Sequence, residues 1–362
     1  MEKAREGNYD LLRVICCIAV ISIHVSSIWF QAITDESIFF GQLYLRGIII
    51  SCMYYTCPRF AVPCFVMLTG AFALSDERNS QYRYYYRKIF KSIGIPTLIF
   101  SFLYFFLNIM LKVWYGGGIL DWLIAVRELI RGKPFAHMWY LYMMIGVYLI
   151  VPLVIRFRYQ VGGEVFSRVA RVFMVLAVLG GCTSSSALSW DIGVSFRYIG
   201  YLMVGYELRR IESRSNKRGI LFIGIGVLVL VLDVVLQYEQ TLMGISDGWL
   251  KDFFLGYLTP LIAISAILIF AGFSCLRVKK NFSKLSALTF MIYLIHPVIL
   301  TFARFVIRYY GYEWDNRIVI PVCIFAVFMM SLAASTIYCN VWKRMEDKWD
   351  ISNRIIRLVK LQ

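Results

Sequence analysis

Long apolar stretches alternate with short polar connections along the whole chain. A helix needs about 20 mainly apolar residues to cross a bilayer, because each residue advances it by about 1.5 Å. The pattern predicts an all-α, polytopic integral membrane protein with about ten transmembrane helices. The expected spans are 11–30, 47–74, 90–113, 138–155, 169–189, 194–209, 218–238, 253–273, 285–307 and 317–341.

The spans predict one membrane-embedded domain over residues 1–362, in which residues 342–362 form a short cytoplasmic tail. Lysine and arginine gather in alternate connections between the spans. Cytoplasmic loops of membrane proteins carry such an excess of cations. We therefore expect both termini to be cytoplasmic.

Composition supports a membrane protein and argues against two other classes. Hydrophobic residues make up 60% of the chain and charged residues 17%, with a mean hydropathy of +0.67, which is too apolar for an ordinary soluble domain. The net charge of +16 lies mainly in the connections, so we expect no nucleic-acid partner. The nine cysteines fall mostly inside apolar stretches and lack metal-ligand spacing. We expect buried thiols and no metal site.

The first span carries ionisable residues on one face. Asp10, Arg13 and His24 recur at steps of three and eleven residues, and eleven residues nearly complete three helical turns over roughly 16 Å. Ionisable groups inside a bilayer nearly always face the protein interior or a water-filled cavity. The stripe predicts an access path from the membrane surface to a buried histidine.

The second span contains Arg59 between Pro58 and Pro63. Proline breaks the helical hydrogen-bond ladder, and an arginine at depth needs a partner or a cavity. Arg59 is therefore a candidate functional residue. The alternative is that it reaches the membrane surface or pairs with a carboxylate for packing alone.

The ninth span has a polar stripe that ends at His296. Ser286, Thr289, Tyr293 and His296 follow one another at steps of three, four and three residues, which is the period of a helix face. Such hydroxyls can also serve only to hydrogen-bond neighbouring helices. His137, the remaining one of the three histidines, falls at the outer end of the fourth span.

These residues together resemble the integral-membrane acyltransferase-3 family. The resemblance is carried by Arg5, Asp10, Arg13 and His24, then RFAVPCFVMLTG, YYYRKIFKSIGIP, HMWYLYMMIGVYLIVP, YIGYLMVGYEL and FMIYLIHP, in this order over nearly the full chain. Within the family, VPCFVMLTG and GKPFAHMWYLY resemble the enterobacterial common antigen O-acetyltransferase type. The resemblance implies a multi-pass enzyme of the bacterial inner membrane.

The resemblance implies O-acyl transfer, with acetyl the expected group, from cytosolic acyl-coenzyme A to a hydroxyl of an envelope glycan or its lipid-linked precursor. Acyl-coenzyme A is then a substrate, and no permanently bound cofactor is expected. Membrane lipids would surround the chain, and the oligomeric state is left open. A relay through an acyl-histidine is an alternative to direct transfer.

Roles for individual residues follow from the same resemblance and from their chemistry. His24 would take the proton of the acceptor hydroxyl, and His296, Tyr293 and Arg59 would orient the acyl group or stabilise the oxyanion. Arginine suits phosphate oxygens, so the cytoplasmic cations are expected to bind the coenzyme. The expected coenzyme-binding residues are Arg5, Asp10 as the partner of Arg13, Arg13, Arg87, Lys88 and Lys91.

A transporter or flippase of a small solute or lipid-linked sugar is the main alternative, because polar residues inside spans also mark transport routes. Transporters often show internal repeats, and none is evident in this sequence. A purely structural membrane subunit is disfavoured by the buried histidines and arginine.

Overall fold

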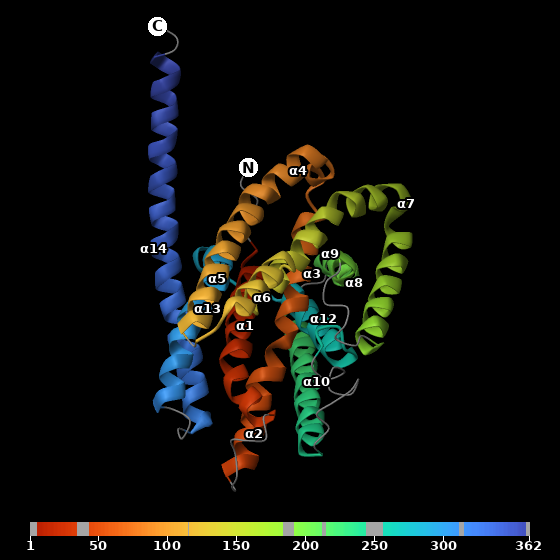
Figure 1. Ribbon diagram of the computed structural model, residues 1–362. Coiled ribbons are helices and arrows are strands. Elements are labelled where there is room, and N and C mark those ends of the chain that lie inside the picture. The colour runs from red at the N-terminus through yellow and green to blue at the C-terminus, as the bar shows by residue number, and fades with distance from the viewer. Residues whose placement is uncertain are drawn as a thin grey trace.

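The structure is a computed structural model that describes residues 6–34, 43–114, 116–183, 192–211, 215–243, 256–310 and 315–359. Every regular element in these ranges is helical (Figure 1). The elements are α1 (Gly7–Thr34), α2 (Leu43–Thr56), η1 (Cys57–Phe60), α3 (Ala61–Ala73), η2 (Glu77–Ser80), α4 (Tyr82–Ile89), η3 (Phe90–Gly94), α5 (Ile95–Trp114), α6 (Ile119–Ile130), α7 (Trp139–Thr183), α8 (Ile192–Arg197), α9 (Ile199–Arg209), α10 (Asn216–Leu242), α12 (Pro260–Cys275), α13 (Ser283–Tyr310) and α14 (Asn316–Val359).

Within the described ranges, seven helical segments are long and apolar enough to cross a membrane. The all-helical, multi-pass prediction agrees with this result, but the count of ten is not confirmed. The three differences have simple causes. The predicted spans 138–155 and 169–189 belong to one element, α7, while α9 has 11 residues and α12 has 16, which is short for a full crossing.

Helix α7 changes direction at its middle. Gly162 has φ 76° and ψ 170°, so the helical backbone is interrupted there although hydrogen bonding continues on both sides. Figure 1 shows the second half of α7 turning over and descending along the side of the bundle. The two halves correspond to the two spans that the apolar pattern predicts.

Helix α1 begins, and helix α14 ends, on the same side of the bundle. Figure 1 places the start of α1 and the end of α14 on one side, and the last part of α14 extends beyond the other helices. Arg209 at the end of α9 also lies here, because its guanidinium pairs with Glu6 at 3.3 Å. We call this side the basic end. It agrees with termini on one side, and its cytoplasmic location is still a prediction.

The orientation can be tested by labelling introduced cysteines in intact cells. Lys217 lies exposed at the start of α10, and Met243 is 70% exposed at the far end of that helix. If the basic end is cytoplasmic, Lys217→Cys will be protected from a membrane-impermeant thiol reagent and Met243→Cys will be labelled. The opposite pattern would reverse the orientation. Native thiols should give little background, because five of the described cysteines are buried.

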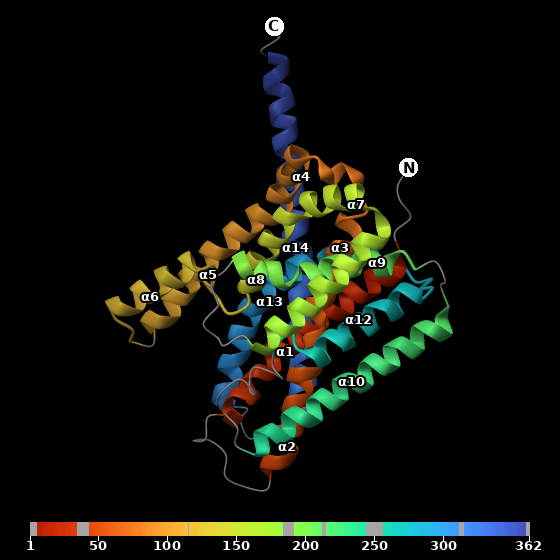
Figure 2. The ribbon, with the colours of Figure 1, turned by 90° about the vertical axis from the view of Figure 1, so that its right-hand side faces the viewer.

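Short helical breaks lie in the interior of the bundle. The 3₁₀ turn η1 separates α2 from α3, and a non-helical segment at 256–259 precedes α12. A third break, residues 131–138, connects α6 to α7, and Figure 2 shows α5 and α6 extending to one side before this connection returns to the bundle. Irregular backbone at membrane depth is tolerated where it is buried in protein or lines a cavity. These breaks surround the site described next.

Candidate functional site

Helices α1 and α13 are tied together by Asp10, Arg13 and Ser286. Arg13 donates from Nη1 to Asp10 Oδ1 at 3.2 Å and to Ser286 Oγ at 2.8 Å. The Ser286 hydroxyl donates to Asp10 Oδ1 at 2.6 Å. Asp10 is buried, whereas the Arg13 side chain is 31% exposed. The carboxylate and hydroxyl thus fix the guanidinium at the boundary of a cavity.

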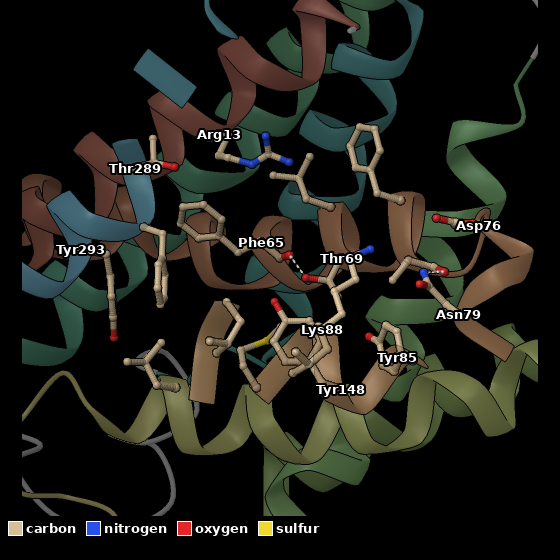
Figure 3. Close-up of a pocket in the computed structure, with 18 of the residues that line it drawn as sticks. Arg13, Phe65, Thr69, Asp76, Asn79, Tyr85, Lys88, Tyr148, Thr289 and Tyr293 are labelled. Carbon is tan, nitrogen blue, oxygen red and sulfur yellow. Dashed lines mark hydrogen bonds between the residues drawn. The ribbon is translucent and has the colours of Figure 1, made fainter. Parts of the chain in front are cut away.

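This large cavity has a volume of about 670 Å³, within the range of about 300–1,000 Å³ that is typical of ligand pockets. It begins near the basic end and reaches inward to Tyr293 (Figure 3). Its walls come from eight elements, so no single stretch of sequence defines it. The charged residues that line it are Glu6, Asp10, Arg13, Asp76, Lys88 and Arg209.

The predicted coenzyme-binding cations fall in different places. Lys88 lines the large cavity together with Arg13 (Figure 3). Arg87 and Lys91 are exposed and are not among its lining residues. Arg5 lies outside the described residues. The binding roles of all these residues stay predictions, but geometry favours Arg13 and Lys88.

Arg209 also lines the large cavity, although the sequence analysis did not single it out. It donates from Nη1 to the carbonyl oxygen of Ala71 at 2.7 Å, and its guanidinium lies 4.4 Å from the ring centre of Phe72. These contacts join α9 to α3. The sequence offered only its place in a basic connection, because the role of Arg209 depends on how these two helices pack.

Asp76, in the connection after α3, supplies a stable negative charge to the same wall. Arg78 donates hydrogen bonds to both carboxylate oxygens, at 3.0 and 2.9 Å. This bonding lowers the pKa of Asp76 from its usual value, with a smaller contribution from Lys88. The carboxylate therefore stays ionised at neutral pH and leaves the cavity with charges of both signs.

All three histidines of the chain converge beyond the inner end of the large cavity. The ring centroids are 5.3 Å apart for His24 and His296, 5.8 Å for His137 and His296, and 6.5 Å for His24 and His137. His137 and His296 are almost fully buried. The two predicted histidines thus lie side by side, and a third joins them.

His137 lies just before the start of α7, as the sequence predicts, but its side chain is buried inside the bundle. The centroid of its ring lies 4.7 Å from that of Tyr104. Its carbonyl oxygen accepts a hydrogen bond from the Tyr293 hydroxyl, with the two oxygens 2.5 Å apart. The residue belongs to the 131–138 connection, which enters the bundle interior. The scarcity of histidine was the only sequence signal that could have linked His137 to the other two.

A small chamber of about 20 Å³, which we call the histidine chamber, lies beside His24 and His137. His24 and His137 line it, and a chamber of this size holds about one water-sized group. Three aromatic residues line both the chamber and the large cavity and form a partition between them. The partition residues are Phe65, Tyr140 and Tyr293.

Arg59 is buried but lines neither cavity. Its guanidinium lies 4.5 Å from the ring centre of Tyr55 and 5.5 Å from that of Tyr257. Tyr257 lines the histidine chamber and so separates it from Arg59. Arg59 is therefore one residue removed from the histidines, which makes a direct contact with a reacting group less favourable than the sequence suggests.

The described residues contain no group of three or more histidine, cysteine, aspartate or glutamate side chains that could hold a metal ion. The three imidazole rings instead stand among aromatic side chains. Histidines in such surroundings can exchange protons with a bound substrate. The arrangement suits acid–base chemistry at the end of a ligand cavity.

Comparison with known protein families gives one match. Residues 6–336 match a family model that is described as an acyltransferase domain, and this range contains both cavities. No curated protein and no solved structure matches the chain. The finer likeness to the enterobacterial common antigen type therefore stays a prediction.

Proposed function

The chain belongs to this acyltransferase family, because the family model covers residues 6–336, and from this premise we propose that it moves an acetyl group from cytosolic acetyl-coenzyme A to a hydroxyl of an envelope glycan or its lipid-linked precursor. The donor, the acceptor and a location in the bacterial inner membrane are parts of this proposal. Nothing in the comparisons favours the transporter or flippase alternative.

One observation carries the proposal: the large cavity and the histidine chamber share a wall. The cavity has Arg13, Lys88 and Arg209 towards the basic end and Tyr293 at its inner end. Guanidinium and ammonium groups suit the phosphates of coenzyme A, while its thioester arm is long and narrow. A coenzyme bound in this direction brings its acyl group to the partition.

The chemistry requires a base close to the acyl group. His24 takes the proton of the acceptor hydroxyl while its oxygen attacks the thioester carbonyl and forms a C–O bond. The tetrahedral intermediate then loses the sulfur, and the proton on His24 passes to the departing thiolate. The products are the O-acetyl ester and free coenzyme A, so atoms and charge balance.

His137 and His296 pack beside His24, with ring centroids 6.5 and 5.3 Å from its own. His296 Nδ1 lies 3.3 Å from the carbonyl oxygen of Ile292, which fixes its ring within α13. Tyr293 is held by its bond to the His137 carbonyl oxygen. In the proposed enzyme these residues position the acyl group against His24, and movement of the partition admits it.

A binding titration tests the donor. The full-length protein in lipid nanodiscs should bind acetyl-coenzyme A and coenzyme A in a calorimeter, whereas acetate should give no heat beyond dilution. Coenzyme A tests the phosphate contacts alone, and acetate tests the acyl group alone. Absence of binding by both coenzymes would overturn the proposed donor.

Arg13 provides a sharper test of the direction in which the coenzyme lies. We expect Arg13→Ala to weaken acetyl-coenzyme A binding roughly 10- to 100-fold, since a hydrogen bond to a charged group contributes about 1.5–3 kcal/mol. Arg13→Lys should restore only part of the affinity, because the forked guanidinium geometry is lost.

Arg168→Ala is the matched control for Arg13. Arg168 is an exposed arginine of α7 that pairs with Glu164 and lines neither cavity. Calorimetric affinity should be unchanged in this variant. Equal affinities in Arg13→Ala and Arg168→Ala would remove Arg13 from the donor site.

A further inference from the structure

Asp233 is a fully buried carboxylate inside the helix bundle. Its neighbours on α10 at positions 231, 232, 235 and 236 are exposed, whereas Asp233 faces inward. Neither carboxylate oxygen has a hydrogen-bond partner within the described part of the chain. A buried polar group without a hydrogen-bond partner costs free energy, so this carboxyl group needs a polar partner that the described residues do not supply.

Arg59 is the cation whose charge acts on Asp233. Among the ion pairs of the described residues, however, none joins the two side chains within 4.0 Å. Arg59 Nε also lacks a hydrogen-bond partner. The two groups are therefore close enough for their charges to interact, but they make no direct ion pair.

Two further buried hydroxyls lie on the helix next to α10. Ser51 Oγ on α2 and Thr56 Oγ1 at its end have no hydrogen-bond partner among the described residues. Helix α10, which carries Asp233, packs against both α2 and η1. We call Ser51, Thr56, Arg59 and Asp233 the Arg59–Asp233 cluster.

The cluster lies at the depth of the histidines. Helices α1 and α10 both begin beside residues 277–280, since Gly7 approaches Val278 and the Asn216 side chain accepts the Arg277 amide at 2.9 Å. His24 and Asp233 each follow the start of their helix by about 26 Å. Tyr257 then links the two places, because it contacts Arg59 and lines the histidine chamber.

The cluster is also separate from the large cavity, which none of its members lines. A coenzyme in the large cavity leaves the acceptor to approach the histidines from another side. Further along α10, Gln237 and Gln240 are buried on the same face as Asp233 and extend the polar surface towards the far end of the helix. This polar face of α10 continues away from the basic end.

The chemistry of the cluster matches a saccharide. A carboxylate, a guanidinium and hydroxyls offer both acceptors and donors, as the vicinal hydroxyls of a sugar require. The stacked rings of Trp139 and Tyr257, with centroids 5.4 Å apart, add a flat apolar surface next to them. A lipid chain would leave the charges unsatisfied.

We infer that the Arg59–Asp233 cluster binds hydroxyl groups of the acceptor saccharide and places one of them at the histidine chamber. This inference rests on the proposed acetyl transfer and names the part of the site that the acceptor occupies. Asp233 accepts a sugar hydroxyl, and Arg59 donates to a sugar oxygen. Both are positioning residues, since the proton of the reacting hydroxyl goes to His24.

The test compares two fates of the acetyl group in the full-length protein in nanodiscs. Water replaces the acceptor when none is present, so hydrolysis of labelled acetyl-coenzyme A reports the donor site and the histidines. Transfer into a total lipid extract of the expressing cells, titrated into the assay, reports the acceptor site. Acetyl-coenzyme A affinity is measured in parallel.

Asp233→Asn should keep hydrolysis and donor affinity within about twofold of the native protein. The amount of extract that gives half-maximal transfer should rise about tenfold or more, because a charged hydrogen bond is lost. Asp121→Asn, a carboxylate change on α6 away from both cavities, should change neither reaction. An unchanged extract dependence in Asp233→Asn would overturn the inference, as would an equal loss of hydrolysis and transfer.

A charge exchange distinguishes a sugar site from an ion pair that only holds helices together. The double variant Arg59→Asp with Asp233→Arg keeps both charges but reverses their positions. If the pair is purely structural, transfer will recover relative to the single variants, and the inference is wrong. Continued loss of transfer in a folded double variant supports it. Failure of the native protein to hydrolyse or bind acetyl-coenzyme A would instead overturn the proposed function.

Discussion

Replacing His24 with asparagine is expected to lower the rate of acetyl transfer by about 10²- to 10⁴-fold, the usual contribution of one positioned general base. The amide keeps the polarity of the position but cannot take the proton of the acceptor hydroxyl. Acetyl-coenzyme A affinity should stay within about twofold, because Arg13 lies roughly 16 Å away along the same helix. The turnover number should fall, whereas the affinity for acetyl-coenzyme A should not change.

The measurement is transfer of labelled acetyl into membrane glycan, with calorimetric binding on the same preparation. Ser27→Ala is the matched control on α1, since its hydroxyl donates to the His24 carbonyl oxygen at 2.8 Å and lines neither cavity. This control should retain most of the activity. If His24→Asn transfers acetyl at close to the native rate, the base must be His137 or His296, or the mechanism is wrong.

The sequence predicts the helical architecture well because a bilayer imposes a simple rule on apolar length. It does not predict the number of full crossings, since that number depends on where helices end inside the bundle. Helix α12 begins at Pro260, in the middle of the predicted span 253–273. Only tertiary packing distinguishes such a partial helix from a complete one.

In the site, too, the sequence predicts contacts within one helix but not contacts between helices. The three-residue step from Asp10 to Arg13 correctly predicts their contact, because the geometry of one helix determines it. Arg209 and Asp233 were not identified as site residues, and His137 was not grouped with the other two histidines. Arg209 and His137 reach the interior through contacts between different elements, which no periodicity within one helix reveals. Asp233 did have a sequence signal, because it is an ionisable residue inside the apolar span 218–238.

The shared wall of the two cavities is also a tertiary feature. Phe65, Tyr140 and Tyr293 come from α3, α7 and α13 and are widely spaced in the sequence. Their convergence explains why a bound donor and the histidines can be close but still separated. The partition makes the position of α3 important, because this helix carries Phe65 and much of the cavity wall.

Gly70→Ala is therefore expected to have the largest effect on folding. A Cβ at Gly70 would overlap the carbonyl oxygen of Leu202, and at the reciprocal contact Gly205 meets the backbone of Met67. Small residues allow such close helix crossings in membranes. The clash involves backbone atoms, so it cannot be relieved by rotating a side chain.

We expect Gly70→Ala to lower the free energy of unfolding by about 3 kcal/mol, the upper part of the range for overpacked sites. Since proteins are stable by only about 5–15 kcal/mol, the folded yield should fall sharply. Thermal unfolding in detergent, followed by a thiol-reactive dye, suits this chain because Cys16 and Cys64 become accessible only when the bundle opens.

Gly224→Ala is the control for this prediction, because a Cβ at Gly224 in α10 meets no atom within 4 Å. Alanine favours a helix over glycine by roughly 0.5–1 kcal/mol, so this variant should match the native protein or unfold at a slightly higher temperature. Equal midpoints for Gly70→Ala and Gly224→Ala would mean that α3 and α9 are further apart than the structure places them. The cavity wall formed by Phe65, Thr69 and Arg209 would then need a different arrangement, because these two helices carry it.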